Sequence, residues 1–497
     1  MPLPPRTIDK AHKRVTALLA VLLLCTAAGC AQDITPVVHV DNPPNAAAQQ
    51  AKHYVILVSL DGLRYDYPQK YGAPHLRAMD TTGASAPDGM LPSYPSLTFP
   101  NHISLVTGLY PEHHGIVANS FFDPARNATY VYTQSKTNGD GSWYGGTPLW
   151  VLAEQQGMRS ACLFWPGSEA AIQGVRPSYY LHFDDKLDDS KRVDQVIAWL
   201  NLPPEQRPHF ITLYYSNVDH AGHSYGPESD EVRAAVHHVD DMIGDLQTKL
   251  AALKLPVDLI VVADHGMVTL KGDPINLSEF AHLDGVHTEG MQIYSKDDAE
   301  AARIYAEFKT HPDPRFTVYR RADLPAQLHF NENPREGDPV IVPNGPYTFR
   351  TQPVNPLANR SPLRGSHGFD PTTMPEMKAI FFAQGPDIKP NTHLPVFENV
   401  NVYPFIAHLL ALKPPLTDGK LEVLAPAIEP KGEAHILLRI HIDKTGTPTD
   451  VQVVHGVNEA IDQKAVEIAR KQHFKPAMKD GVPVEVDVKL DMKIDAF

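Results

Sequence analysis

Four short apolar runs lie between residues 52 and 430 and predict buried strands. They span residues 54–60, 210–215, 259–263 and 379–383. Runs of this length that end in turn residues are typical of strands covered on both faces. Between the second and third runs, apolar residues recur at alternating four- and three-residue steps, which predicts one buried helix face; they are Val232, Val236, Val239, Ile243, Leu246 and Leu250. This alternation of strands and helices predicts an α/β fold with a mainly parallel sheet flanked by helices.

The pattern changes twice towards the C-terminus. Residues 334–362 contain seven prolines and little periodicity, which predicts a long structured loop near His367. Beyond residue 430, apolar and polar positions predict strands at 434–442, 451–454 and 484–494, with a helix at 458–471. We therefore expect a large domain at 52–430 and a small α+β domain at 432–497.

The N-terminal segment predicts export. A basic stretch precedes an apolar run at 15–24, and small residues follow it up to Cys30. This order is typical of a signal peptide, here residues 1–29, and the apolar run is too short to span a bilayer. Two interpretations stay open. Residues 27–30 resemble a lipobox, which would place a lipoprotein with a lipid anchor at Cys30 on the periplasmic side of the outer membrane. Alternatively, cleavage near Ala31 would release a soluble periplasmic protein.

Residues 30–51 are rich in Ala, Pro, Gln and Asn, and predict a solvated tether. The chain has three cysteines, of which Cys162 lies in an apolar run and is interpreted as a packing residue, so no disulfide is expected. The formal net charge of -14 has no basic block against it, which argues against binding to duplex nucleic acid.

Carboxylates and imidazoles follow the predicted strands. Asp61 follows the first run, Asp219 and His223 follow the second, and Asp264 and His265 follow the third, while His367 lies in a glycine-flanked turn. Each motif alone is weak, because an Asp-Gly pair after a strand is usually a turn. Together they count for more, since ligands in open α/β sheets gather at the carboxyl ends of strands. Aspartate and histidine are ligands that suit zinc.

Several motifs, in this order along the chain, resemble the nucleotide pyrophosphatase/phosphodiesterases of the alkaline phosphatase superfamily, including bacterial members. They are Ser96–His102, Thr107–Gly115, Asn119, Phe164–Glu169 and Gly174–Pro177, and the resemblance runs from about residue 54 to 424. It implies an alkaline-phosphatase-like fold. It also implies that Thr98 is the nucleophile of a phospho-threonine intermediate and that Asn119 donates to a phosphoryl oxygen.

The same resemblance implies two Zn²⁺ ions and a small-molecule nucleotide substrate, cleaved to a nucleoside 5′-monophosphate. The first ion would bind Asp61, Asp264 and His265 and contact Thr98. The second would bind the other three residues of the strand-end set, Asp219, His223 and His367. In the family's nucleotide-binding members the base lies between aromatic faces; Phe99, Phe183 and the underlying Tyr214 match these positions. The alternative is that these three are core residues near the sheet.

The C-terminal segment resembles the C-terminal domain of TonB-type energy transducers, notably at Phe474–Ala477 and Asp480–Pro483. This resemblance implies an envelope protein as partner, although no membrane helix or proline-rich spacer precedes the segment. Two other hypotheses stay open for the whole chain. The substrate could be a choline-type phosphodiester or a lysophospholipid. Alternatively, the chain could be an envelope interaction protein on an inactive hydrolase scaffold.

Overall fold

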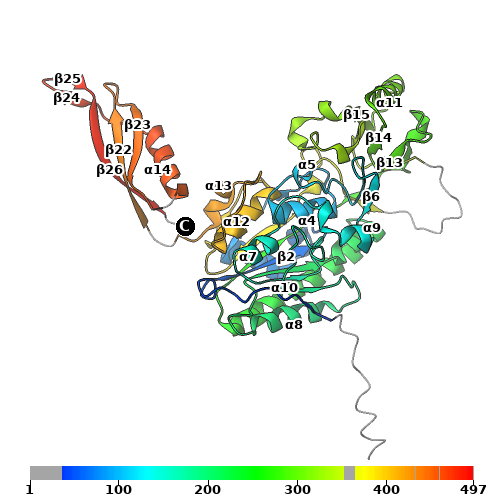
Figure 1. Ribbon diagram of the computed structural model, residues 1–497, viewed down its shortest axis with the longest axis horizontal. Helices are drawn as coiled ribbons and strands as arrows, with labels where there is room; N and C mark the ends of the chain where they lie inside the picture. Colours follow the sequence, from blue (N-terminus) through cyan, green and yellow to red (C-terminus); the bar gives the residue numbers. More distant parts are fainter. Residues whose placement is uncertain (1–35, 352–363, 431–432, 458, 496–497) are drawn as a thin grey trace, which may run out of the picture.

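The computed structural model describes residues 36–351, 364–430, 433–457 and 459–495. Figure 1 shows a central body, a second lobe that carries α11 (Asp298–Thr310), and a C-terminal unit. The predicted signal peptide and Cys30 lie outside the described residues.

The central body is built on a mixed sheet. Within the described residues its strand order is β1 (Val38–His39), β8 (Tyr179–Leu181), β7 (Ser160–Leu163), β9 (Phe210–Tyr215), β2 (Tyr54–Leu60), β10 (Val257–Val262), β19 (Phe381–Gln384), β3 (Ala84–Ser85) and β20 (Thr392–His393). The five strands from β8 to β10 are parallel to one another. The predicted fold class is therefore confirmed, and all four predicted strands are present.

The strand predicted at 379–383 runs against its neighbour. β19 pairs antiparallel with β10, with Val262 opposite Phe381. Because β19 is antiparallel, it begins at the edge of the sheet where the parallel strands end. This direction explains why His367, which precedes a strand instead of following one, can lie at the same edge as Asp61 and Asp264.

Helices cover both faces of the sheet. In Figure 1, α8 (Asp189–Leu200) and α10 (Asp230–Leu253) lie below it, and α4 (Thr98–Thr107) and α12 (Val402–Leu409) lie above. The apolar stripe predicted on α10 is buried along its whole length, from Val232 to Leu250. The core of the body therefore consists of the predicted strands and the helix faces packed on them.

The second lobe corrects the loop predicted at 334–362. Its four-stranded sheet has the order β13 (His287–Glu289), β14 (Gln292–Tyr294), β16 (Val340–Pro343) and β15 (Phe316–Tyr319). Thus β16 is an inner strand inside the expected loop, after the 3₁₀ turn η5 (Pro334–Glu336). Pro339 and Pro343 flank this short apolar run. Because prolines are typical of loops, the sequence pattern did not indicate a strand here. The lobe has its own apolar core, and residues 352–363 of the predicted loop lie outside the described residues.

The tether predicted at 30–51 is wrong for its described part. β1 pairs antiparallel with β8 and forms one edge of the central sheet. Asn45 is buried, and its side chain donates to the carbonyls of Pro204 and Arg207 and accepts from the N–H of Arg159. Three specific hydrogen bonds from one amide hold this segment on the body, which its polar composition did not reveal.

The C-terminal unit is a three-stranded antiparallel sheet with β22 (Glu433–Ile442) between β23 (Pro448–His455) and β26 (Val486–Asp495). One face packs on α14 (Glu459–Lys471) around a separate apolar core. A hairpin of β24 (Ala477–Lys479) and β25 (Val482–Val484) was not predicted. Across the described part of the chain, no helix is both long and apolar enough to cross a membrane.

Candidate active site

Three adjacent strands bring the predicted aspartates together. Asp61 follows β2, Asp264 follows β10, and Asp219 lies on α9 (Asn217–Tyr225), which begins after β9. The Asp219 N–H donates to the Asp61 carbonyl at 3.1 Å. Gly62 permits this approach: its φ is +72°, and a Cβ there would lie 2.9 Å from Asp219 Cα. The turn after β2 therefore needs glycine for both its conformation and its closeness to α9.

The first cluster joins Asp61, Asp264 and His265 to Thr98. His265 Nε2 lies 3.0 Å from Asp264 Oδ2 and 3.5 Å from Asp61 Oδ1. Thr98 Oγ1 lies 3.3 Å from the same nitrogen. The structure thus brings the predicted nucleophile to the predicted ligands of the first metal ion.

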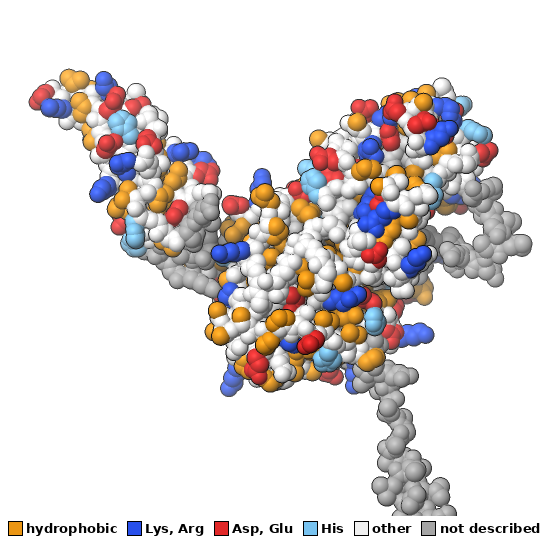
Figure 2. Space-filling view, viewed as in Figure 1, with side chains coloured by type: hydrophobic (Ala, Val, Ile, Leu, Met, Phe, Trp, Pro, Cys, Tyr) orange, Lys and Arg blue, Asp and Glu red, His pale blue; other side chains and the backbone are white. Residues whose placement is uncertain are grey.

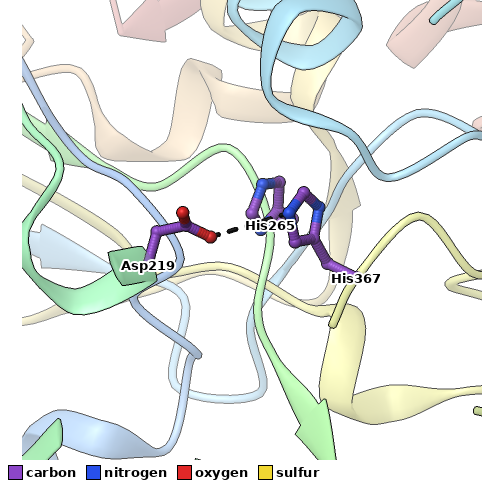
Figure 3. A group of neighbouring side chains, drawn as sticks. All are labelled: Asp219, His265 and His367. Carbon is purple, nitrogen blue, oxygen red and sulfur yellow. Dashed lines mark ion pairs between the residues drawn. The ribbon is translucent and has the colours of Figure 1, made fainter. Parts of the chain in front are cut away.

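The second cluster consists of Asp219, His223 and His367. Asp219 and His223 are one turn apart on α9, with Asp219 Oδ1 3.3 Å from His223 Nε2. His367 Nε2 lies 3.6 Å from the same oxygen and 3.1 Å from His223 Nε2. Figure 3 shows that His265 also faces this cluster, with its ring stacked on that of His367 at 3.5 Å between centroids. The two clusters are therefore neighbours.

The histidines are oriented for a metal ion. The Nδ1 atoms of His223, His265 and His367 lie within 3.0 Å of the carbonyl oxygens of Gly365, Gly266 and Ser96, respectively. An Nδ1–H that donates to a carbonyl leaves the Nε2 lone pair for a ligand bond, which is the usual arrangement at metal-binding histidines. All three Nε2 atoms point into the clusters described above.

The aspartates complete the test of fit. Asp61 Oδ1, Asp219 Oδ1 and Asp264 Oδ2 are buried and have no hydrogen-bond partner among the described residues. Buried polar atoms are normally satisfied, so three such oxygens in one place indicate a site that suits a cation. Carboxylate oxygens and imidazole nitrogens in groups of three also suit zinc. The residues present therefore fit a metal centre.

The electrostatics of the clusters agree with this assignment. Burial, together with the charges of Asp264 and Asp219, raises the pKa of Asp61 well above its ordinary value. Burial also raises the pKa of Asp264, but His265 and His102 outweigh it and lower that pKa below its usual range. A bound cation would relieve the repulsion among these carboxylates.

Thr98 and Asn119 are held side by side. Thr98 is the first residue of α4, and the next N–H along the helix, that of Phe99, donates to Asn119 Oδ1 at 2.9 Å. Because the amide oxygen accepts this bond, the amide nitrogen of Asn119 keeps its N–H groups for a ligand. His102, the last residue of the motif Ser96–His102, is buried below, with Nδ1 2.8 Å from the Thr98 carbonyl and Nε2 2.8 Å from Ser59 Oγ.

A cavity of about 400 Å³ opens over both clusters. The predicted residues that line it are Asp61, Thr98, Phe99, Asn119, Phe183, Tyr214, Asp219, His223 and His367. Asp264 and His265 lie beneath these residues and are fully buried. Lining residues that the sequence argument missed include Tyr132, Asn138, Glu169 and His220. Glu169 lay in a motif already noted, Phe164–Glu169, and His220 lies between the predicted ligands Asp219 and His223.

The three predicted aromatic residues have different surroundings. Phe99 is buried and meets the ring of Tyr132 edge to face at 5.3 Å between centroids. Phe183 is 51% exposed at the cavity wall and meets Phe164 edge to face at 5.4 Å. Tyr214 is buried, and its hydroxyl donates to Asp61 Oδ2 at 2.6 Å. The structure therefore connects Tyr214 to a predicted metal ligand as well as to the cavity.

Comparison with known proteins identifies the class. Residues 55–370 match the family model for type I phosphodiesterase/nucleotide pyrophosphatase, and the chain belongs to this family of enzymes. Residues 426–493 match the model for the C-terminal domain of Gram-negative bacterial TonB proteins. The family is metal-dependent, in agreement with the clusters described here.

Individual relatives match about three quarters of the chain. An uncharacterised pyrophosphatase/phosphodiesterase of Schizosaccharomyces pombe is 34% identical over 391 residues, which are 75% of this chain and 80% of that protein. Human ectonucleotide pyrophosphatase/phosphodiesterase family member 1 is 34% identical over 402 residues, 76% of this chain, but the match spans only 42% of the human protein. These relatives are eukaryotic, so a bacterial origin is not shown by them.

Solved structures show the same fold. Murine ectonucleotide pyrophosphatase/phosphodiesterase 5 superposes with a TM-score of 0.70 and 28% identity, over 76% of this chain and 100% of the murine chain. An inactive threonine-to-alanine variant of that protein, in complex with AMP, matches equally well. The expected alkaline-phosphatase-like fold is thus confirmed.

Proposed function

We propose that this enzyme is a two-zinc nucleotide pyrophosphatase/phosphodiesterase that releases nucleoside 5′-monophosphates through a phosphorylated Thr98. One observation carries the proposal: two clusters of metal-binding side chains meet beside the Thr98 hydroxyl, under a single cavity. The AMP complex of an inactive threonine variant of the murine relative supports a nucleotide substrate and a role for threonine.

The metal ions would be held by the two clusters, where their charge would favour the Thr98 alkoxide and neutralise phosphoryl oxygens. Thr98 Oγ1 then attacks the phosphorus, and a P–Oγ1 bond forms as the bond to the leaving oxygen breaks. Attack by water on this phospho-threonine restores the hydroxyl and releases the monophosphate. The N–H groups of Asn119 would donate to a non-bridging phosphoryl oxygen, and the N-terminus of α4 favours the negative charge that develops there.

Phe99 and Phe183 would hold the base of the substrate. Both rings line the cavity that also contains Thr98, and stacking on aromatic rings tolerates any base. These two rings therefore do not select one base over another.

The test compares 4-nitrophenyl thymidine 5′-phosphate with 4-nitrophenyl phosphate, before and after chelation and after zinc is restored. We expect fast cleavage of the diester, slow cleavage of the monoester, loss with chelator and recovery with zinc. Thr98→Ala, which keeps all the aspartate and histidine ligands, should be inactive. If the zinc-loaded enzyme cleaves glycerophosphocholine but not the nucleotide diester, the choline-type alternative replaces the proposal.

We also propose, from the sequence, that the chain is exported and anchored through Cys30, and that the C-terminal unit binds an envelope protein. The first part is checked by metabolic labelling with palmitate, which Cys30→Ala should abolish. The second part is checked by crosslinking the full chain in cells, with a deletion of residues 432–497 as the control. Loss of partner capture in that deletion, with hydrolysis retained, is the expected result.

A further inference from the structure

We infer that Glu169 and His182 position Phe183, so that its ring is ready to stack on the base of a nucleotide. The inference rests on the proposed function, because it concerns one wall of the proposed nucleotide site. It assigns Glu169 and His182 a role in substrate affinity rather than in the chemical step.

The carboxylate of Glu169 bridges two successive residues that follow β8. Its Oε1 accepts from the Phe183 N–H at 2.9 Å, and its Oε2 lies 2.5 Å from His182 Nδ1. Glu169 is itself fixed, because its carbonyl accepts from Arg176 Nε at 3.0 Å. One carboxylate thus holds the Phe183 backbone N–H with one oxygen and the neighbouring His182 side chain with the other.

Phe183 needs such support because little else holds it. Its ring is 51% exposed, and the two aromatic rings that it meets among the described residues, Phe164 and, at 6.2 Å between centroids, Tyr214, are both edge to face with it. An exposed ring on an unsupported loop would sample several positions, and binding would have to restrict them. A ring that is already in place avoids that loss of entropy at the moment of binding.

The geometry also separates Glu169 from catalysis. Its carboxylate oxygens face the Phe183 N–H and the His182 imidazole, while Thr98 and the metal-binding clusters involve other elements. Substitution of a residue that acts through Phe183 should change the KM for substrates that carry a base and leave the KM for substrates without a base unchanged. This difference makes the inference testable without reference to overall activity.

The experiment measures kcat and KM of Glu169→Ala for 4-nitrophenyl thymidine 5′-phosphate and for methyl 4-nitrophenyl phosphate, which has the same leaving group and no base. We expect KM for the nucleotide to rise about tenfold, within the range of about 5- to 150-fold that one stacked base contributes, and kcat to stay within about twofold. The kinetics with the methyl ester should not change.

Three further variants control for a merely structural effect. Glu169→Gln keeps an oxygen that can accept from the Phe183 N–H, so it should restore most of the affinity. His182→Ala keeps that hydrogen bond and should raise KM less than Glu169→Ala. If Glu169 acts through Phe183, then adding Glu169→Ala to Phe183→Ala should raise KM no further.

Two results would overturn the inference alone: an equal loss on both substrates, or additive effects in the double variant, which would mean that Glu169 contacts the base directly. Wild-type enzyme that cleaves neither diester would instead overturn the proposed function, and the inference with it. Thermal unfolding of each variant shows whether it is folded at the assay temperature.

Discussion

The edge of the central sheet and the open face of the C-terminal sheet both carry histidine–aspartate pairs. In the first, His265 and Asp264 are fully buried and 3.0 Å apart. In the second, His441 on β22 faces Asp487 on β26 at 2.7 Å, with side chains 38% and 68% exposed. The residue types and the distances are similar, so neither of them explains why only the first pair belongs to a candidate metal site.

Burial and hydrogen bonding make the difference. At the central sheet, three aspartate oxygens are buried without a hydrogen-bond partner among the described residues, and three imidazoles turn their Nε2 atoms towards them. At the C-terminal sheet, both members of the pair are exposed and bond to each other, and Figure 2 shows acidic and basic side chains interspersed over this unit. A bound cation would stabilise the buried, unsatisfied cluster, whereas an exposed pair adds little stability to the fold.

The largest expected effect comes from Asp264→Asn. This change removes a charge from the first cluster and leaves His265 without its nearest carboxylate. We expect the kcat/KM for the nucleotide diester to fall by about 10³-fold or more, with about one zinc ion lost per chain. Metal analysis and kinetics check this, and Asp487→Asn is the matched control. Full zinc content in Asp264→Asn would contradict the assignment of this residue as a ligand.

Asn119→Ala should have the next largest effect. Its amide is proposed to donate to the phosphoryl oxygen, and removal of one such donor typically costs about 10²- to 10³-fold in kcat. Zinc content should stay at the wild-type value, because Asn119 is outside both clusters. Steady-state kinetics beside metal analysis distinguish this result from a loss of metal. A normal kcat would show that Asn119 serves only to hold the Phe99 N–H.

Tyr214→Phe separates two roles for one side chain. The Tyr214 hydroxyl donates to Asp61, and loss of a group that supports a metal ligand typically weakens metal binding about 10- to 100-fold. We therefore expect weaker zinc affinity in competition with a chelator, while KM for the nucleotide at saturating zinc is unchanged. Tyr215→Phe, which alters a buried neighbouring tyrosine, is the control. The opposite pattern, a raised KM with normal zinc affinity, would support the original prediction that Tyr214 contacts substrate.

The sequence was sufficient for those parts of the site that follow regular elements. Asp61, Asp219 and Asp264 could be placed together because apolar runs show where parallel strands end. Thr98 and Asn119 needed the family resemblance, since no periodicity separates a nucleophile from an ordinary helix start. Their roles remain predictions that the experiments above address.

Other features could not be predicted because they depend on contacts distant in sequence. Tyr132 and Glu169 reach the cavity from irregular segments, where no repeat shows the direction of a side chain. Asn45 was taken for part of a tether because its three partners lie more than 100 residues away. The antiparallel direction of β19 depends on its pairing with β10, which a run of apolar residues does not encode.

The smallest expected effect is that of His441→Ala in the C-terminal sheet. Hydrogen bonding to Asp487 raises the pKa of His441, so the fold favours its protonated form. Any stabilisation from the pair is therefore complete below the ordinary histidine pKa of about 6.5 and is lost as the pH rises through the folded-state value. Since the pair is exposed, thermal unfolding at pH 5.5 and at pH 8 should differ little between wild type and variant, and hydrolysis should be unchanged. A marked loss of diester hydrolysis would show that the two sheets are functionally coupled. It would also show that exposure alone does not distinguish a pair without a role in hydrolysis from a pair that takes part in it.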